Sequence, residues 1–163
     1  MKTELVEISP LKDEAEAETA GRWIYQEWAR LEAPAVWQEN KADILRSLDP
    51  AVTIPKFFGC RVDGELAGIA SVVPHDLPTC PTWGPWLANV LVMPHWRRRG
   101  FGSALVRYAM EYADGLVPAL YLYTFDQVGL YLRLGWQTVR EDVYLGRPIT
   151  IMRHSAAPRA SVP

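Results

Sequence analysis

The clearest chemical signal in the sequence lies between residues 90 and 105. Three consecutive arginines, at positions 97–99, precede glycines at positions 100 and 102, and a helix-forming stretch follows. The N–H groups at the start of a helix point outward with about half a positive charge behind them. Glycine lets an anion approach that backbone closely, and arginine adds charge and planar donors. The segment therefore predicts a binding site for phosphate groups.

The spacing distinguishes three kinds of phosphate-binding loop. A P-loop requires Gly-x-x-x-x-Gly-Lys-Ser/Thr, which the sequence lacks. A dinucleotide fingerprint requires Gly or Ala three residues after the second glycine, where Leu105 stands. The pattern that is present, Arg97-x-x-Gly100-x-Gly102, resembles the pyrophosphate loop of the GNAT superfamily of N-acetyltransferases, which bind acetyl-CoA. Coenzyme A carries a pyrophosphate and a ribose phosphate, so a cationic loop suits it.

A second segment, residues 130–136, supports the same resemblance. It looks like the family's late helix, in which a tyrosine is followed four residues later by a glycine and then an aromatic residue; here these are Tyr131, Gly135 and Trp136. The resemblance implies an acetyl-CoA-dependent N-acetyltransferase. Such an enzyme passes the acetyl group directly to a primary amine of a small molecule or peptide, through a tetrahedral intermediate.

The resemblance also implies how the donor binds. In the family, two neighbouring parallel strands separate where the first carries a bulge, and the pantetheine arm hydrogen-bonds the backbone in that opening. The pyrophosphate would sit on the amides of residues 98–103. Asp126 stands where many relatives carry an asparagine that contacts pantetheine, and a helix-capping role is equally open for it. The expected donor-binding residues are Val90, Leu91, Val92, Arg97, Arg98, Arg99, Gly100, Phe101, Gly102, Ser103 and Asp126.

Two residues are candidates for catalysis. Tyr131 is the candidate proton donor to the departing CoA thiolate, because a tyrosine with an ordinary pKa of about 10 is protonated at neutral pH. No carboxylate occurs in residues 86–93, where many family members place a glutamate base. Asn89 in that segment is the candidate for positioning a water. Other polar residues weighed for the site are His75 and Asp76, near where the family binds acceptors, and His95, beside the phosphate loop.

Hydrophobic periodicity predicts the elements that must position these residues. Ser9-Pro10 is read as the cap of a first helix that ends before Pro34, and Asn40 as the cap of a short second helix ending at residue 48. Thr124 or Asp126 is expected to cap the late helix, which runs to residue 134 and is closed by Gly135. A third helix is expected to carry apolar residues on one face from residue 101 onward and to end at Asp114-Gly115. Strands are expected at residues 5–8, 56–62, 66–73, 86–93, 119–124, 137–144 and 148–152.

The predicted fold class is therefore α/β (α+β), with the order β-α-α-β-β-β-α-β-α-β-β. As in the GNAT fold, we expect a mixed, mostly antiparallel central sheet flanked by helices. With 163 residues, 49% of them hydrophobic, the chain can bury a substantial core. We expect a single acetyltransferase-like domain over residues 1–153 and a flexible C-terminal tail over residues 154–163.

Composition limits the other possibilities. A formal net charge of −2 argues against a protein held to nucleic acid or a membrane surface by its overall field. Cys60 and Cys80 show no metal-ligand spacing, so no metal is expected, and no apolar run of signal-peptide length occurs. A cytoplasmic protein is the resulting prediction.

Several alternatives stay open at this stage. The same loop would serve a non-catalytic or weakly catalytic acyl-CoA-binding regulatory domain, and the enzyme could transfer a longer acyl group or act on a hydroxyl. A weaker alternative is a nucleic-acid-binding domain that uses the arginines against phosphates. The identity of the acceptor, and the choice between monomer and homodimer, are not determined by the sequence.

Overall fold

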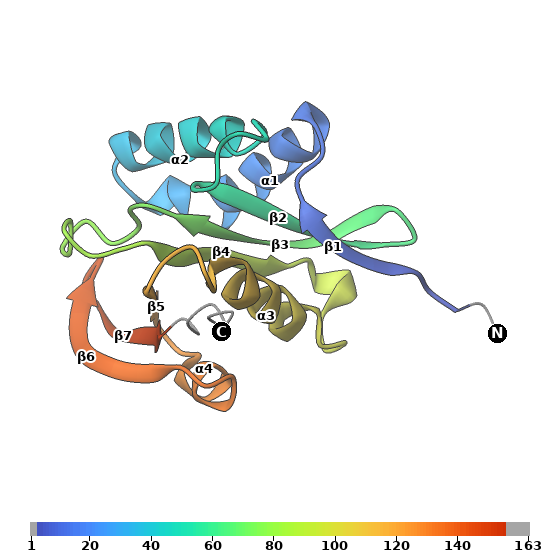
Figure 1. The fold of residues 1–163 in the computed structure, drawn as a ribbon. Coiled ribbons are helices and arrows are strands. Elements are labelled where there is room, and N and C mark those ends of the chain that lie inside the picture. The colour runs from blue at the N-terminus through green and yellow to red at the C-terminus, as the bar shows by residue number, and fades with distance from the viewer. Residues whose placement is uncertain (1–2, 156–163) are drawn as a thin grey trace, which may run out of the picture.

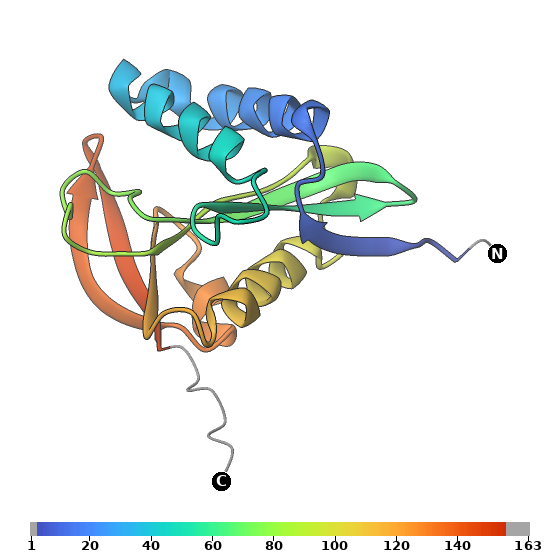
Figure 2. The same ribbon diagram turned by 45° about the horizontal axis from the view of Figure 1, so that its top comes forward.

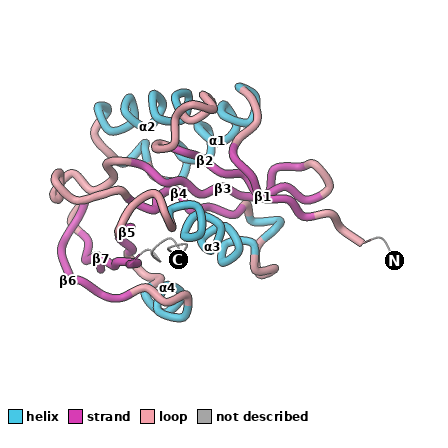
Figure 3. The backbone as a smooth tube through the Cα atoms, viewed as in Figure 1, coloured by secondary structure: helices cyan, strands magenta, loops and turns pink. Residues whose placement is uncertain are grey.

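The computed structural model describes residues 3–155, which form a seven-stranded sheet with helices on both faces (Figures 1 and 3). The strands lie in the order β1-β2-β3-β4-β5-β7-β6, and every neighbouring pair is antiparallel except β4 and β5. The elements are β1 Val6–Pro10, α1 Glu14–Glu27, η1 Ala29–Leu31, α2 Pro34–Arg46, β2 Lys56–Val62, β3 Glu65–Val73, β4 Trp86–Val92, η2 Pro94–Trp96, α3 Phe101–Ala113, β5 Ala119–Thr124, α4 Val128–Arg133, β6 Gln137–Tyr144 and β7 Arg147–Ser155.

The sheet separates two hydrophobic cores. Helices α1 and α2 cover one face, and α3 and α4 cover the other (Figures 1 and 2). Successive residues of a strand point to opposite faces, so Phe57 of β2 packs into the first core and Phe58 into the second. Both faces of the central strands are therefore buried, which explains their nearly continuous apolar sequences. The predicted order of elements and the mixed, mostly antiparallel sheet are confirmed.

The start of the first helix differs from the prediction. Pro10 is the last residue of β1, opposite Phe58, and the pairing continues as the N–H of Leu11 donates to β2. The helix begins after Asp13, whose carboxylate accepts from the N–H of Glu16 over 2.9 Å. Reading Ser9-Pro10 as the cap was wrong because the edge of β2 offers this segment a strand partner, which a local pattern does not reveal.

The second helix is longer than predicted. It begins at Pro34 and contains Asn40 in its interior, so Asn40 is not its cap. Proline suits the first position of a helix because its φ is preset and its missing N–H would have no partner there. The sequence-based prediction used Pro34 only to end the first helix. The short 3-10 helix η1, Ala29–Leu31, separates the two helices.

The late elements lie close to the prediction. At the end of β5 the Thr124 hydroxyl accepts from the N–H of Gln127, so Thr124 rather than Asp126 stabilises the turn into α4. Strand β7 runs through His154 and Ser155, because it pairs along the whole of β5. The remainder of the expected tail, residues 156–163, lies outside the described residues.

Candidate functional site

The parallel strands β4 and β5 pair at one position and then separate. Trp86 lies opposite Tyr121, whose N–H donates to the Pro85 carbonyl over 3.0 Å. Within residues 3–155 no further bridge joins these two strands, so the edge of β4 that faces β5 is open from Leu87 onward. Open backbone donors and acceptors of this kind can bind an extended ligand as a neighbouring strand would.

A β-bulge in β4 lies at this opening. Strand β4 has one residue more than β3 between the pairs Ser71–Ala88 and Ile69–Leu91. Asn89, at the bulge, has a φ of 57°, a left-handed conformation that asparagine tolerates better than most residues. Its side-chain amide donates to the Ser71 hydroxyl over 3.0 Å, and that hydroxyl donates to the Ala88 carbonyl over 2.9 Å. The Asn89 side chain is thus used to hold the bulge.

The bulge changes which side chains face which core. Before it, Ala88 packs on the α1 and α2 side; after it, Val90 and Val92 pack on the α3 side and Leu91 on the α1 and α2 side. The carbonyl of Val92 accepts from Nε of Arg97 over 2.9 Å. Arg97 is therefore tied to the end of β4, beside the open backbone of residues 90–92.

The loop after β4 presents a row of unpaired amides. The N–H of Arg97 still bonds to Pro94, and that of Ala104 begins the helical pattern by bonding to Gly100. Between them, the N–H groups of residues 98–103 have no acceptor among the described residues. Arg98 (φ 65°) and Gly100 (φ 82°) take left-handed conformations that turn the chain into α3. Consecutive amides at such a turn form a concave anion site.

The three arginine side chains of the loop are all exposed but differ in their contacts. Arg97 bonds to the end of β4, as described. Arg99 contacts Glu4 over 3.2 Å and stacks on Trp96, 5.3 Å from the ring centre. Arg98 makes no hydrogen bond, ion pair or ring contact through its side chain within the described part of the chain. Arg98 is thus the loop cation that is most available to a ligand.

Gly102 leaves room that the protein itself does not fill. A Cβ built there would lie 3.7 Å from Val92 Cγ2, an ordinary contact distance. The helix would therefore accept a larger residue at this position. Gly100 is different, because its φ of +82° would strain any residue with a side chain.

Tyr131 is held on the α3 side of the sheet. Its ring is 8% exposed and packs edge-on against Trp136, with ring centres 6.0 Å apart. Burial raises the pKa of its hydroxyl to about 12. That hydroxyl has no hydrogen-bond partner within residues 3–155, and no buried polar atom there lacks a partner, so the oxygen reaches solvent. Tyr131 therefore keeps its proton at neutral pH and presents it outward.

The other polar residues singled out from the sequence lie nearby but are less constrained. Asp126 is exposed, two residues before α4, and its side chain makes no hydrogen bond or ion pair with the described residues. His95 is exposed in η2, where its ring meets Trp96 edge-on with centres 4.9 Å apart.

A second polar group, which we call the acidic cluster, lies on the α1 and α2 side. It consists of Glu32, Tyr123 and Tyr144, together with Asp76, whose charge helps to raise the pKa of both tyrosines. The Tyr144 hydroxyl donates to Glu32 Oε2 over 2.6 Å, and the rings of Tyr123 and Tyr144 are 5.6 Å apart. Of these four residues, only Asp76 was a candidate site residue from the sequence. The other three come from distant segments, and no short motif joins them.

The family assignment follows from comparison with known proteins. The sequence model of the acetyltransferase (GNAT) family matches residues 22–136, which include both the arginine-glycine loop and Tyr131. The chain belongs to the acetyltransferase (GNAT) family. The family membership inferred from the two motifs is thereby confirmed, and with it an acetyltransferase as the class of enzyme. No curated protein matches the sequence.

Solved structures of GNAT proteins share the fold. An aminoglycoside 6'-N-acetyltransferase complexed with coenzyme A has a TM-score of 0.67 at 17% identity, over 95% of this chain and 99% of its own. The yncA protein of Salmonella typhimurium, with acetyl-CoA, gives 0.68 at 16% identity over 96% of each chain. A GNAT-family protein from Desulfovibrio desulfuricans gives 0.69 at 18% identity, covering 94% of this chain and all of its own.

The described residues contain neither a metal-binding group nor a membrane-spanning helix. Residues 3–155 contain no group of three or more histidine, cysteine, aspartate or glutamate side chains placed to hold a metal ion. None of the helices in that span has both the length and the apolar character needed to cross a membrane.

Proposed function

We propose that this chain transfers the acetyl group of acetyl-CoA directly to a primary amine of a small molecule or peptide. The observation that carries the proposal is the row of unpaired amides from Arg98 to Ser103, placed just beyond the opening between β4 and β5. A diphosphate needs such donors, and an extended pantetheine arm needs such an open strand edge. The two features occur in the order in which those parts follow one another in coenzyme A.

Donor binding uses backbone and side chains together. Residues 90–92 offer hydrogen bonds to the pantetheine amides, and the amides of residues 98–103 bind the pyrophosphate. Arg98 and Arg99 lie exposed in the same loop, where they add charge for the phosphates. Phe101 and Asp126 border the donor at the start of α3 and before α4. Arg97 acts by holding the loop against the end of β4.

The chemistry needs a proton for the departing sulfur. A CoA thiol has a pKa near that of cysteine, about 8.5, so tyrosine is the weaker acid and the transfer of its proton to the sulfur is uphill. The transfer must therefore be coupled to the return of the second ammonium proton from the nitrogen of the intermediate to the tyrosinate. Tyr131 supplies that proton, since burial keeps its hydroxyl neutral and its oxygen reaches solvent. Asn89 acts as a positioning residue, because its bond to Ser71 holds the bulge that separates the strands.

The proposal also includes the class of acceptor and the cellular compartment. Solved relatives of this fold include aminoglycoside acetyltransferases, which favours a small-molecule amine as acceptor. Cys60 and Cys80 are both buried free thiols, as expected in a reducing compartment such as the cytoplasm.

A thiol-release assay tests the proposal. Purified protein with acetyl-CoA and a panel of primary amines should release CoA thiol only when a suitable amine is present. Tyr131→Phe should lower kcat about 100-fold while the Kd for CoA and the Tm stay within error, because the hydroxyl makes no hydrogen bond within residues 3–155. Tyr108→Phe, a change on the same side of the sheet, is the matched control. Binding of CoA without turnover of any amine would instead indicate a regulatory binding domain.

A further inference from the structure

Building on the proposed function, we propose that Glu4 competes with coenzyme A for the side chain of Arg99. The Glu4 carboxylate holds this arginine in the free protein, and the diphosphate of the donor displaces the carboxylate. Glu4 therefore weakens donor binding, and the segment that leads into β1 is coupled to the donor site. The two residues are 95 positions apart in sequence, so only the folded sheet brings them together.

The contact between the two side chains is direct. Nη1 of Arg99 donates to both carboxylate oxygens of Glu4, over 3.2 Å to Oε1 and 3.3 Å to Oε2. The same guanidinium lies over the Trp96 ring, 5.3 Å from the ring centre. The Trp96 ring in turn contacts that of Phe101, the first residue of α3, with centres 6.5 Å apart. Arg99 is thus held between an anion and an aromatic ring, at the edge of the loop that binds the donor.

Glu4 is presented by an anchored segment of the backbone. The N–H of Leu5, the next residue, donates to Oδ1 of Asp63 over 2.9 Å, and the N–H of Asp63 donates to the Leu5 carbonyl over 2.8 Å. Asp63 begins the tight turn between β2 and β3, where its φ is 50°. Val6 then starts the pairing of β1 with β2. The sheet itself therefore fixes the position from which the Glu4 carboxylate reaches the loop.

The ion pair and the donor opening lie on different sides of β4. Strands β1, β2 and β3 precede β4 in the sheet, whereas the opening lies between β4 and β5 (Figure 1). Glu4 thus draws the Arg99 side chain toward β1. The backbone N–H of Arg99, in contrast, belongs to the row of unpaired amides of residues 98–103. A diphosphate on these amides would lie beside the backbone of Arg99, so its long side chain can turn from Glu4 to the phosphates.

The charges favour the donor in this competition. The side chains of Arg99 and Glu4 are 43% and 47% exposed. Pairs of this kind are weak, because water screens both charges and because two long side chains lose freedom in forming them. A diphosphate carries more charge than one carboxylate, and it binds the loop amides at the same time. The donor can therefore displace Glu4, at the cost of breaking the ion pair.

The coupling acts in both directions. If Glu4 lowers the affinity for coenzyme A, bound coenzyme A weakens the contact between Glu4 and Arg99 by the same factor. The donor thereby frees the Glu4 side chain when it binds. Any change that neutralises Glu4 or moves it away from the loop should tighten donor binding.

A double-mutant cycle, with the Kd for CoA measured by titration calorimetry, tests the competition. Glu4→Gln keeps the size of the side chain but removes its charge, so the Kd should fall about threefold at low salt. Arg99→Gln should raise the Kd, and adding Glu4→Gln to it should change nothing further, since Glu4 acts through Arg99. Glu65→Gln is the matched control, because Glu65 is an exposed acid of β3 whose side chain makes no hydrogen bond or ion pair within residues 3–155.

Two further measurements separate competition from a structural role of Glu4. The gain in affinity should disappear in about 0.5 M sodium chloride, where exposed charges are screened, while the Tm of the variant stays within error of the wild type. The same threefold gain is expected with 3′-dephospho-CoA, because that ligand retains the diphosphate.

The outcomes distinguish this inference from the proposed function. An unchanged Kd in Glu4→Gln would overturn the competition, and a raised Kd would mean that Glu4 positions Arg99 for the donor instead. An equal gain in the Arg99→Gln background would overturn the role of Arg99. A gain that requires the 3′-phosphate would overturn the assignment of Arg99 to the diphosphate. Failure of the wild-type protein to bind CoA at all would overturn the proposed function itself.

Discussion

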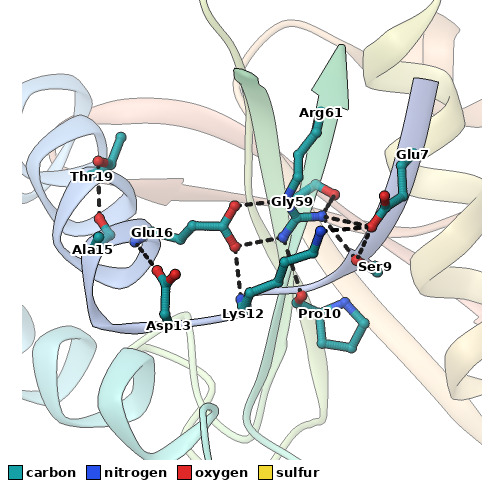
Figure 4. A network of polar contacts seen from close by, with 10 residues as sticks. All are labelled: Glu7, Ser9, Pro10, Lys12, Asp13, Ala15, Glu16, Thr19, Gly59 and Arg61. Carbon is teal, nitrogen blue, oxygen red and sulfur yellow. Dashed lines mark hydrogen bonds and ion pairs between the residues drawn. The ribbon is translucent and has the colours of Figure 1, made fainter. Parts of the chain in front are cut away.

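Arginine is used in two opposite ways in this molecule. Arg61 on β2 is 2% exposed and is surrounded by acceptors (Figure 4). It makes two bonds of 2.6 Å to the Glu16 carboxylate and one of 2.9 Å to the Ser9 hydroxyl, and it reaches the carbonyls of Gly59 and Pro10. The guanidinium thereby joins β1, α1 and β2.

The loop of residues 97–103 also carries arginines, but its donors are not surrounded by hydrogen-bond acceptors as those of Arg61 are. Its arginines are exposed, Arg98 makes no hydrogen bond or ion pair within the described part of the chain, and the amides beside it are unpaired. Amino-acid composition alone therefore does not distinguish an arginine that stabilises the fold from an arginine that is available to a ligand. Satisfied donors hold the fold, whereas unsatisfied donors stay available to a ligand.

The acids show the same contrast. Hydrogen bonds from Arg61 hold the pKa of Glu16 below its usual value, whereas burial without a cation raises the pKa of Asp76 to about 8. The signs of the linked stability are opposite. Glu16 stabilises the fold above its unfolded pKa, and this is lost as the pH falls through its folded pKa. Asp76 is protonated at little cost below its unfolded pKa, and stability falls as the pH rises toward 8.

The largest expected effect comes from breaking the paired region. Arg61→Met leaves the Glu16 carboxylate without its partner, so we expect the free energy of unfolding at pH 7 to drop by about 3 kcal/mol. The acid-dependent loss of stability due to Glu16 should shrink as well. Urea unfolding followed by circular dichroism between pH 3 and 7 measures both. The Kd for CoA, measured where the variant is folded, should not change.

Lys12→Met is the matched control for that prediction. Lys12 belongs to the same network but is exposed, 3.1 Å from Glu7, with about half of each side chain in solvent (Figure 4). Such pairs contribute roughly 0–1 kcal/mol. A similar loss of stability in both variants would mean that the buried pairing of Arg61 has no special weight, and the contrast with the loop would fail.

A smaller effect is expected in the unpaired region. Gly102→Ala adds a methyl group where the protein has room but where a diphosphate would lie against the backbone. We expect the Kd for CoA to rise about tenfold, or about 1.4 kcal/mol. The Tm should stay equal or rise, because alanine favours a helix over glycine. Titration calorimetry and thermal unfolding separate the two effects. A variant that binds CoA normally would argue that no phosphate approaches this turn.

Local patterns in the sequence were sufficient for much of the fold and for the phosphate loop. Gly100 and the arginines before it signal an anion turn because the signal lies within a few residues, and the strand 119–124 is predicted to its exact ends. The predicted secondary structure was wrong where a segment distant in sequence determines the local conformation. Pro10 extends a strand because β2 lies beside it, and Pro34 opens a helix as well as closing one.

The acidic cluster marks the limit of that reasoning. Glu32 and Tyr144 are brought together only by the β6–β7 hairpin curving toward α2, so no spacing rule connects them. The bulge in β4 left a weaker trace: Asn89 is the one polar residue in an otherwise apolar strand, and asparagine is the type that tolerates its left-handed φ. That residue was singled out for positioning a water, whereas its amide is bonded to Ser71.

The most direct test is to titrate ¹⁵N-labelled protein with coenzyme A and follow the backbone amides by NMR. We predict that the N–H resonances of residues 98–103 move downfield together, as donors to phosphate do, while those of Glu16 and Arg61 stay in place. Saturable binding that leaves residues 98–103 unshifted, or no binding at millimolar coenzyme A, would contradict the assignment of this turn as the donor site.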